Sequence, residues 1–390
     1  MLSFSSSSTA PPLTILLLLL LSSLRPATSC YRSIISFGDS VTDTGNLIRY
    51  PGRENDHATR LPFGRTHFGR PTGRFSDGRL VVDFLAEAFG LPPVPPFLGG
   101  AGDGGDGFRR GVNFAVGGAT AIDNDFFREK GFHVRWPNYS LNVQLESFKK
   151  LLPSLCSSAS ECKDFLSKSL VLVGEIGGND YNHGFLQRRN FAEIEALVPK
   201  VIDVIASAVT ELISLGARTL VVPGNFPIGC VPVYLAMYKS NQEEDYELDT
   251  GCIKWMNVFA EYHNHKLLEE LDRLRKHNPS TTIIYVDYYN AAMNIFRSPD
   301  SYGFGREPFA ACCGGGGGPH NFDPSILCGS DKAKVCDNPS EYISWDGLHL
   351  TEAAYKTIAD MVIHGPFADP AINSTCASIN MEVNNHHEEL

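Results

Sequence analysis

The sequence has no excess of positive charge and, beyond its first residues, no long apolar run. Its 33 Lys and Arg residues are outnumbered by 44 Asp and Glu residues, which gives a formal net charge of −11. This balance lacks the basic surface that nucleic-acid binding needs, so we expect no nucleic-acid partner. No stretch after residue 29 is long and apolar enough to span a bilayer, so we expect no stable membrane span in the processed chain.

The one long apolar run lies at the N-terminus and is too short for a membrane span. It extends from Leu13 to Leu24 and is followed by the small residues Ala27-Thr28-Ser29. An apolar core of about ten residues before a small-x-small site is typical of a signal peptide, although Lys and Arg are missing ahead of it. We predict a signal peptide over residues 1–29, with an uncleaved anchor as the alternative. The expected location is extracellular, in the apoplast, with the Golgi or vacuole lumen as alternatives.

The ten cysteines include no Cys-x-x-Cys pair, so the usual spacing of a zinc site is missing. In an oxidising compartment such a number of cysteines favours disulfides. The short intervening loops favour Cys156–Cys162 and Cys230–Cys252, and the remaining pairings stay open. The glycine run from 314 to 318 lacks the preceding strand and the Lys-Ser/Thr pair of a phosphate-binding loop. We expect neither a metal nor a cofactor.

The composition is that of a globular protein, with 43% hydrophobic and 20% charged residues. We find no internal repeat and no linker that divides the chain. We therefore predict a single domain over residues 30–376 and a disordered tail over residues 377–390. Asn138 and Asn373 each begin an Asn-x-Ser/Thr tripeptide and are predicted glycosylation sites.

Short apolar segments alternate with helical patterns along the chain. We predict strands at 33–37, 170–176, 219–222 and 282–287, and helices at 80–90, 191–215, 254–277 and 351–363. This alternation favours a parallel sheet covered by helices on both faces. In such sheets, ligands bind at the carboxyl ends of the strands. Ser40 and Asn179 both follow a predicted strand, so they are expected near one another.

The polar residues at these positions are those of nucleophilic catalysis. Ser40 lies in a tight Gly-Asp-Ser turn after a strand, which exposes a hydroxyl that needs a base to become nucleophilic. His349 is the candidate base, and Asp346 is the candidate carboxylate that orients it. The backbone N–H groups of Ser40 and Gly118 and the side-chain amide of Asn179 are candidate donors to an oxyanion.

These blocks resemble the GDSL esterase/lipase family, the SGNH hydrolases, in its plant branch. They read Phe37 to Asn46, Gly111 to Thr120, Gly177 to Asp180 and Asp346 to His349, and the likeness continues through Pro71 to Gly78. The resemblance implies an α/β fold, a flavodoxin-like three-layer α/β/α sandwich with a central parallel sheet. It implies Ser40, Asp346 and His349 as the catalytic triad, with Gly118 and Asn179 in the oxyanion hole. Within the family the chain is most similar to a subgroup that includes sinapine esterases and acetylajmalan acetylesterase.

We therefore expect a secreted serine esterase that hydrolyses carboxylic esters, with a short acyl or acetyl group, through an acyl-Ser40 intermediate. The expected partner is a small-molecule or polysaccharide ester substrate. One alternative is an acyltransferase, because the first half-reaction is the same. A deacetylase of acetylated cell-wall polysaccharide and a non-catalytic binding protein of the same fold are the others.

Overall fold

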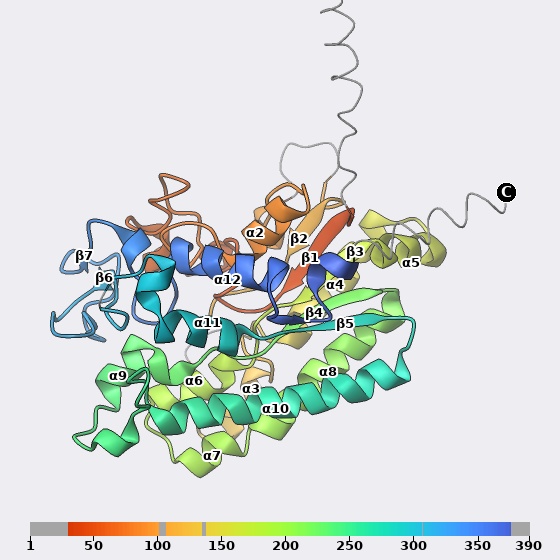
Figure 1. The fold of residues 1–390 in the computed structure, drawn as a ribbon. Helices are drawn as coiled ribbons and strands as arrows, with labels where there is room; N and C mark the ends of the chain where they lie inside the picture. The colour runs from red at the N-terminus through yellow and green to blue at the C-terminus, as the bar shows by residue number, and fades with distance from the viewer. Residues whose placement is uncertain (1–29, 101–106, 135–137, 306, 376–390) are drawn as a thin grey trace, which may run out of the picture.

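A computed structural model describes residues 30–100, 107–134, 138–305 and 307–375 (Figure 1). The predicted signal peptide at 1–29 and the predicted tail at 377–390 lie outside the described residues. No helix within the described ranges is long and apolar enough to cross a membrane.

The centre of the protein is a six-stranded sheet with the order β2-β1-β3-β4-β5-β8. Neighbouring strands from β2 to β5 run parallel, and only β8 runs antiparallel to its neighbour. The strands are β1 (Ser33–Phe37), β2 (Gly111–Asn113), β3 (Ser169–Val173), β4 (Thr219–Pro223), β5 (Thr282–Val286) and β8 (Ala368–Asp369). The order of the five parallel strands is that of the flavodoxin-like fold, as predicted.

Helices cover both faces of this sheet. They are α2 (Val81–Ala88), α3 (Asn124–Glu129), α4 (Leu141–Leu155), α5 (Ala159–Ser167), α6 (Gly178–Leu186), α7 (Phe191–Glu195), α8 (Val198–Leu215), α9 (Pro232–Met237), α10 (Lys254–His277), α11 (Tyr288–Arg297) and α12 (Glu352–His364). Figure 1 shows α2, α11 and α12 on one side of the sheet, with α8 and α10 on the other. The prediction of a three-layer α/β/α arrangement is confirmed.

The predicted elements are present, with two differences in extent. The single helix predicted over 191–215 is two helices, α7 and α8, because Pro199 lies in the first turn of α8. Proline has no N–H to donate and is tolerated only where a helix begins. The strand predicted to reach residue 176 ends at Val173, since the chain turns there toward α6.

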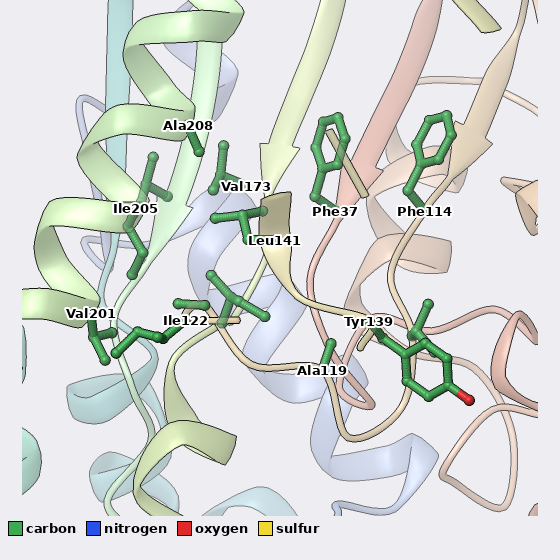
Figure 2. Close-up of a cluster of buried hydrophobic side chains, with 14 of the residues drawn as sticks. Phe37, Phe114, Ala119, Ile122, Tyr139, Leu141, Val173, Val201, Ile205 and Ala208 are labelled. Carbon is green, nitrogen blue, oxygen red and sulfur yellow. The ribbon is translucent and has the colours of Figure 1, made fainter. Parts of the chain in front are cut away.

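The strands are buried on both faces, and their side chains alternate between two cores. Ile35 and Phe37 point into the core shared with α4, α8 and α10, whereas Ile34 points into the core beneath α2 and α12. Each fully buried aliphatic side chain contributes roughly 1.5–3 kcal/mol. Figure 2 shows the first core where it reaches the ends of β1 and β3, with Val201 and Ile205 of α8 facing it.

Disulfides brace the segments outside the sheet. The predicted pairs Cys156–Cys162 and Cys230–Cys252 are both present. Two further bridges, Cys312–Cys336 and Cys313–Cys328, close the segment that holds the small hairpin β6 (Cys313–Gly314) and β7 (Lys334–Val335). This segment contains the glycine run, which lies inside the loop closed by Cys313–Cys328.

Candidate active site

Ser40 lies at the point in the sheet where neighbouring connections diverge. The chain leaves β1 toward β2 on one side, while β3 lies on the other side of β1. At such a point the loops at the carboxyl ends separate and leave a crevice. The turn that follows β1 is held by Gln144 of α4, which accepts from the Gly38 N–H at 2.9 Å and donates to the Gly38 carbonyl at 2.8 Å.

The turn from Asp346 to His349 shapes the second part of the site. One oxygen of Asp346, Oδ1, accepts the backbone N–H groups of Leu348 and His349 at 3.0 and 2.8 Å. The other, Oδ2, lies 2.7 Å from His349 Nδ1. The turn is closed by the Trp345 N–H, which donates to the His349 carbonyl at 2.8 Å. The carboxylate therefore has both oxygens occupied and orients the imidazole ring.

The imidazole of His349 joins the two segments. Its Nε2 lies 2.8 Å from Ser40 Oγ, although the two residues are 309 positions apart in the chain. Burial alone would raise the pKa of Asp346, but the charge and hydrogen bonds of His349 outweigh it and lower this pKa to about 2. With Asp346 ionised, the Nδ1 proton faces the carboxylate and Nε2 is left to accept from the Ser40 hydroxyl.

Asn179 lies at the beginning of α6, on the other side of Ser40. The residue before this helix, Gly177, has a φ of 108°, and a Cβ there would come 2.7 Å from Val201, so glycine is needed. The amide nitrogen of Asn179 donates to Asp39 Oδ2 at 2.9 Å and to the Ala119 carbonyl at 3.0 Å. The side chain is therefore fixed between the residue before Ser40 and the residue after Gly118.

The segment that contains Gly118 is held against the other parts of the site by buried carboxylates. Asp43 accepts the Gly117 N–H at 2.8 Å, and Asp180 accepts the Ala121 and Ile122 N–H groups at 2.8 and 3.0 Å. The ring of Phe75 lies 4.8 Å from the His349 ring. A Cβ on Gly117 would come 2.5 Å from that same phenyl ring, so only glycine allows this approach.

A cavity of about 810 Å³, including its open mouth, lies over these residues. Ser40, Asn179 and His349 line it, whereas Gly118 is not among its lining residues and Asp346 lies behind His349. Its walls are apolar and aromatic for the most part, formed by Phe226, Ile228, Val231, Pro232, Tyr234, Ala292, Phe296, Leu348 and Leu350. No Lys or Arg is present among the described residues that line it.

Three buried acids near the site were not expected from the sequence. Asp43 and Asp180 lie within the quoted motifs, but an aspartate in a polar segment also fits an ordinary turn. Glu175 lines the cavity, and nothing in its local sequence distinguishes it from a residue that ends a strand. No group of three or more His, Cys, Asp or Glu side chains in the described part of the chain is placed to hold a metal ion.

The two predicted glycosylation sites differ in their surroundings. Asn138 is half-buried, and its amide donates to Asp123 at 3.1 Å. Ser140, the third residue of that tripeptide, is buried and caps α4. Asn373 is exposed, so its amide is open to modification. Glycosylation at both sites stays a prediction.

The fold and this arrangement define a class of hydrolase. A serine hydroxyl, an imidazole and a carboxylate in sequence, at the carboxyl edge of a flavodoxin-like sheet, can attack an acyl carbonyl without a cofactor.

Comparisons with known proteins give the family. The model of the GDSL-like lipase/acylhydrolase family matches residues 34–362. Two GDSL esterase/lipases of Arabidopsis thaliana are 51% and 50% identical over 347 and 349 residues, and each alignment covers 89% of this chain and 87% of the relative. Sinapine esterase of Brassica napus is 47% identical over 367 residues, with 93% of each protein covered. The chain belongs to the GDSL lipase/acylhydrolase family and is a carboxylic ester hydrolase.

Proposed function

We propose that this protein is a secreted serine esterase that cleaves carboxylic esters through an acyl-Ser40 intermediate. The observation that carries the proposal is the continuous contact from Asp346 Oδ2 to His349 Nδ1 at 2.7 Å and from His349 Nε2 to Ser40 Oγ at 2.8 Å. This contact pattern supports general-base activation of the hydroxyl, because the carboxylate accepts the Nδ1 proton of His349 and leaves Nε2 free to accept the proton of Ser40.

In the proposed reaction, Ser40 Oγ attacks the ester carbonyl carbon while His349 Nε2 takes the hydroxyl proton. The carbonyl oxygen becomes an oxyanion, which accepts from the N–H groups of Ser40 and Gly118 and from the Asn179 amide. Collapse of this intermediate expels the alcohol, which receives its proton from His349. Water then attacks the acyl group by the same route and regenerates Ser40.

The lining of the cavity supports a neutral or positively charged ester over an anionic one. Asp39 and Glu175 are its acidic residues, and no Lys or Arg among the described lining residues offsets their charge. An anionic substrate would meet like charge in a desolvated site. The apolar walls next to Ser40 suit the expected short acyl or acetyl group, and the open mouth leaves the alcohol part of the ester toward solvent.

A second candidate is deacetylation of, or acyl transfer to, a cell-wall polysaccharide. The cavity has an open mouth, which supports access for a chain end or side group. Because hydrolysis and transfer share the acyl-Ser40 step, product analysis with a sugar alcohol separates them. A panel that contains p-nitrophenyl acetate, acetyl-xylan and sinapoyl choline tests the substrate class, and an untagged protein found only inside the cell would contradict secretion.

The test of the mechanism is Ser40→Ala against Ser330→Ala, which removes an exposed hydroxyl. We expect the first variant to lose p-nitrophenyl acetate hydrolysis by about 10⁶-fold in kcat and to lose labelling by a fluorophosphonate. The second should match the unaltered protein in both assays. Hydrolysis that persists in folded Ser40→Ala protein would refute the acyl-Ser40 route.

A further inference from the structure

Two buried carboxyl groups lie beside Ser40, and the proposed reaction uses neither. Asp39 is 2% exposed and Glu175 is 6% exposed, and both line the cavity. Each side chain alters the pKa of the other, so the two carboxyl groups lie close together. Two carboxylates this close in a desolvated site repel each other, which favours a proton on one of the two groups.

This pair connects the turn that contains Ser40 to the start of α6. Asp39 Oδ1 accepts the Val41 N–H at 2.9 Å, and Asp39 Oδ2 accepts the Asn179 amide at 2.9 Å. The Glu175 carboxyl group lies against the start of α6, where a Cβ on Gly178 would come 2.8 Å from its Oε1. The backbone N–H of Asp39 also donates to the Glu175 carbonyl at 3.2 Å. The Asp39 side chain thus reaches Asn179 itself, and the other side-chain contacts of the pair reach Val41 and Gly178, which neighbour Ser40 and Asn179.

The surroundings favour one negative charge on the pair rather than two. Burial, followed by the charge and hydrogen bond of Glu175, raises the pKa of Asp39 well above its ordinary value. Burial also raises the pKa of Glu175. The titratable groups that act on the pair come from the turn before α12, from α6, from α11 and from α12, and they are His349, Asp180, Tyr181, Tyr288 and Tyr355.

The state of Asp39 matters because Asn179 has no spare donor. Its amide hydrogens go to Asp39 and to the Ala119 carbonyl, so one must leave its acceptor before it can bind a substrate oxyanion. A protonated carboxyl group is a weaker acceptor than a carboxylate, since hydrogen bonds to ionised groups are about twice as strong. A second charge would also repel the oxyanion that forms in the same desolvated space.

We propose that Asp39 and Glu175 share one proton and act as a positioning pair that keeps the Asn179 amide available to the oxyanion. This inference rests on the proposed ester hydrolysis. When the shared proton leaves to solvent, Asp39 becomes a carboxylate, holds the Asn179 amide and places a second negative charge beside the oxyanion. The pair therefore limits kcat on the alkaline side, where His349 is already in its basic form.

The test is the pH profile of kcat for Glu175→Gln against Glu129→Gln, which changes an exposed glutamate. Glutamine keeps the shape of the side chain but removes the charge that keeps Asp39 protonated. We expect the alkaline decline in kcat to begin about one pH unit lower or more in Glu175→Gln and to stay unchanged in Glu129→Gln. An alkaline decline at the same pH in both variants and in the unaltered protein would overturn the proposal.

A spectroscopic measurement gives a second readout, which a purely structural role would not alter. The infrared carbonyl band of a protonated carboxyl group should be present in the unaltered protein at neutral pH and lost in Glu175→Gln. Unchanged intensity would contradict a shared proton. If Glu175→Gln does not fold, Glu175→Ala replaces it, because it removes the same charge, and the same earlier alkaline decline and the same loss of the band are expected.

The outcome is separable from that of the proposed function. A protein that neither hydrolyses esters nor reacts with a fluorophosphonate at Ser40 would contradict the serine esterase itself. A protein that does both, but in which the alkaline decline of kcat occurs at the same pH with and without Glu175→Gln, would contradict only the role of the pair.

Discussion

Replacement of Asp346 by asparagine should disable His349 without disturbing the turn around it. Asp346 Oδ1 accepts two backbone N–H groups, from Leu348 and His349, so the asparagine oxygen must occupy that position. The amide NH₂ group then takes the place of Oδ2, which lies 2.7 Å from His349 Nδ1. Because NH₂ donates, it forces Nδ1 to accept and leaves the ring proton on Nε2.

The Nε2 atom would then donate to Ser40 Oγ, at 2.8 Å, and would no longer accept its proton. The same change in serine protease triads lowers kcat about 10⁴-fold, which corresponds to about 5 kcal/mol of transition-state stabilisation. We expect a loss of this size in kcat with p-nitrophenyl acetate, smaller than that of Ser40→Ala. The KM should change little, because Asp346 does not line the cavity.

The matched control is Asp331→Asn, which alters an exposed aspartate. It should leave kcat and KM as they are. Fluorophosphonate labelling of Ser40 should slow in Asp346→Asn in parallel with kcat, since both reactions need the same base. A folded Asp346→Asn protein whose kcat stays within about tenfold of the unaltered protein would refute the assignment of Asp346 as the residue that orients His349.

Three further predictions concern stability and modification. Loss of the Cys313–Cys328 bridge, which closes 15 residues, should lower the free energy of unfolding by about 3 kcal/mol. Equal denaturation midpoints for Cys313→Ala/Cys328→Ala and the unaltered protein would contradict this loss of stability. Activity should fall too, because the Cys313 N–H donates to the Trp345 carbonyl at 2.7 Å, next to Asp346. Folding lowers the pKa of Asp346 to about 2, so its carboxylate stabilises the folded protein at pH values above the ordinary pKa of an aspartate. This stabilisation is lost as the pH falls through about 2. The stability gap between the unaltered protein and Asp346→Asn should therefore shrink by about 2 kcal/mol from pH ~5 to pH ~2, and a constant gap would count against it. Asn373→Gln should reduce the mass of the secreted protein by one glycan, and an unchanged mass would rule out glycosylation there.

The central strands were predictable from the sequence, because a strand buried on both faces needs apolar side chains at adjacent positions. β1, β4 and β5 each contain two or three adjacent aliphatic residues, and each was predicted to within one residue at either end. The strands β2 and β8 were missed because they have three and two residues, and their pairing comes from neighbouring strands. Such short segments are extended only because the sheet edge offers them hydrogen-bond partners.

The helix α6 shows where local sequence misleads. It begins with Gly178-Asn179-Asp180, residues that favour turns, and yet it continues to Leu186. Tertiary contacts outweigh propensity here, since Asp180 accepts two N–H groups from the 121–122 segment and Tyr181 bonds His263 of α10 at 2.7 Å. Helix propensities differ by less than about 1 kcal/mol per residue, so a few buried contacts reverse them.

Some residues of the candidate site could be predicted from the sequence and others could not. Ser40, Asp346 and His349 were predicted from their motifs, because nucleophilic chemistry needs those residue types and the spacing of Asp346 and His349 lets them meet within one turn. Glu175 was missed because its partner Asp39 is close only after β1 and β3 have paired.

The sequence by itself determined which reactive groups the protein has and which strand ends they follow, because alternating apolar and helical patterns specify a parallel sheet and tight polar turns follow its strands. Only the tertiary structure decided that His349 reaches Ser40 from 309 residues away and that two carboxyl groups lie together in a desolvated pocket. Distances between remote segments and the burial that alters ionisation depend on how the layers pack, and no local pattern in the chain encodes them.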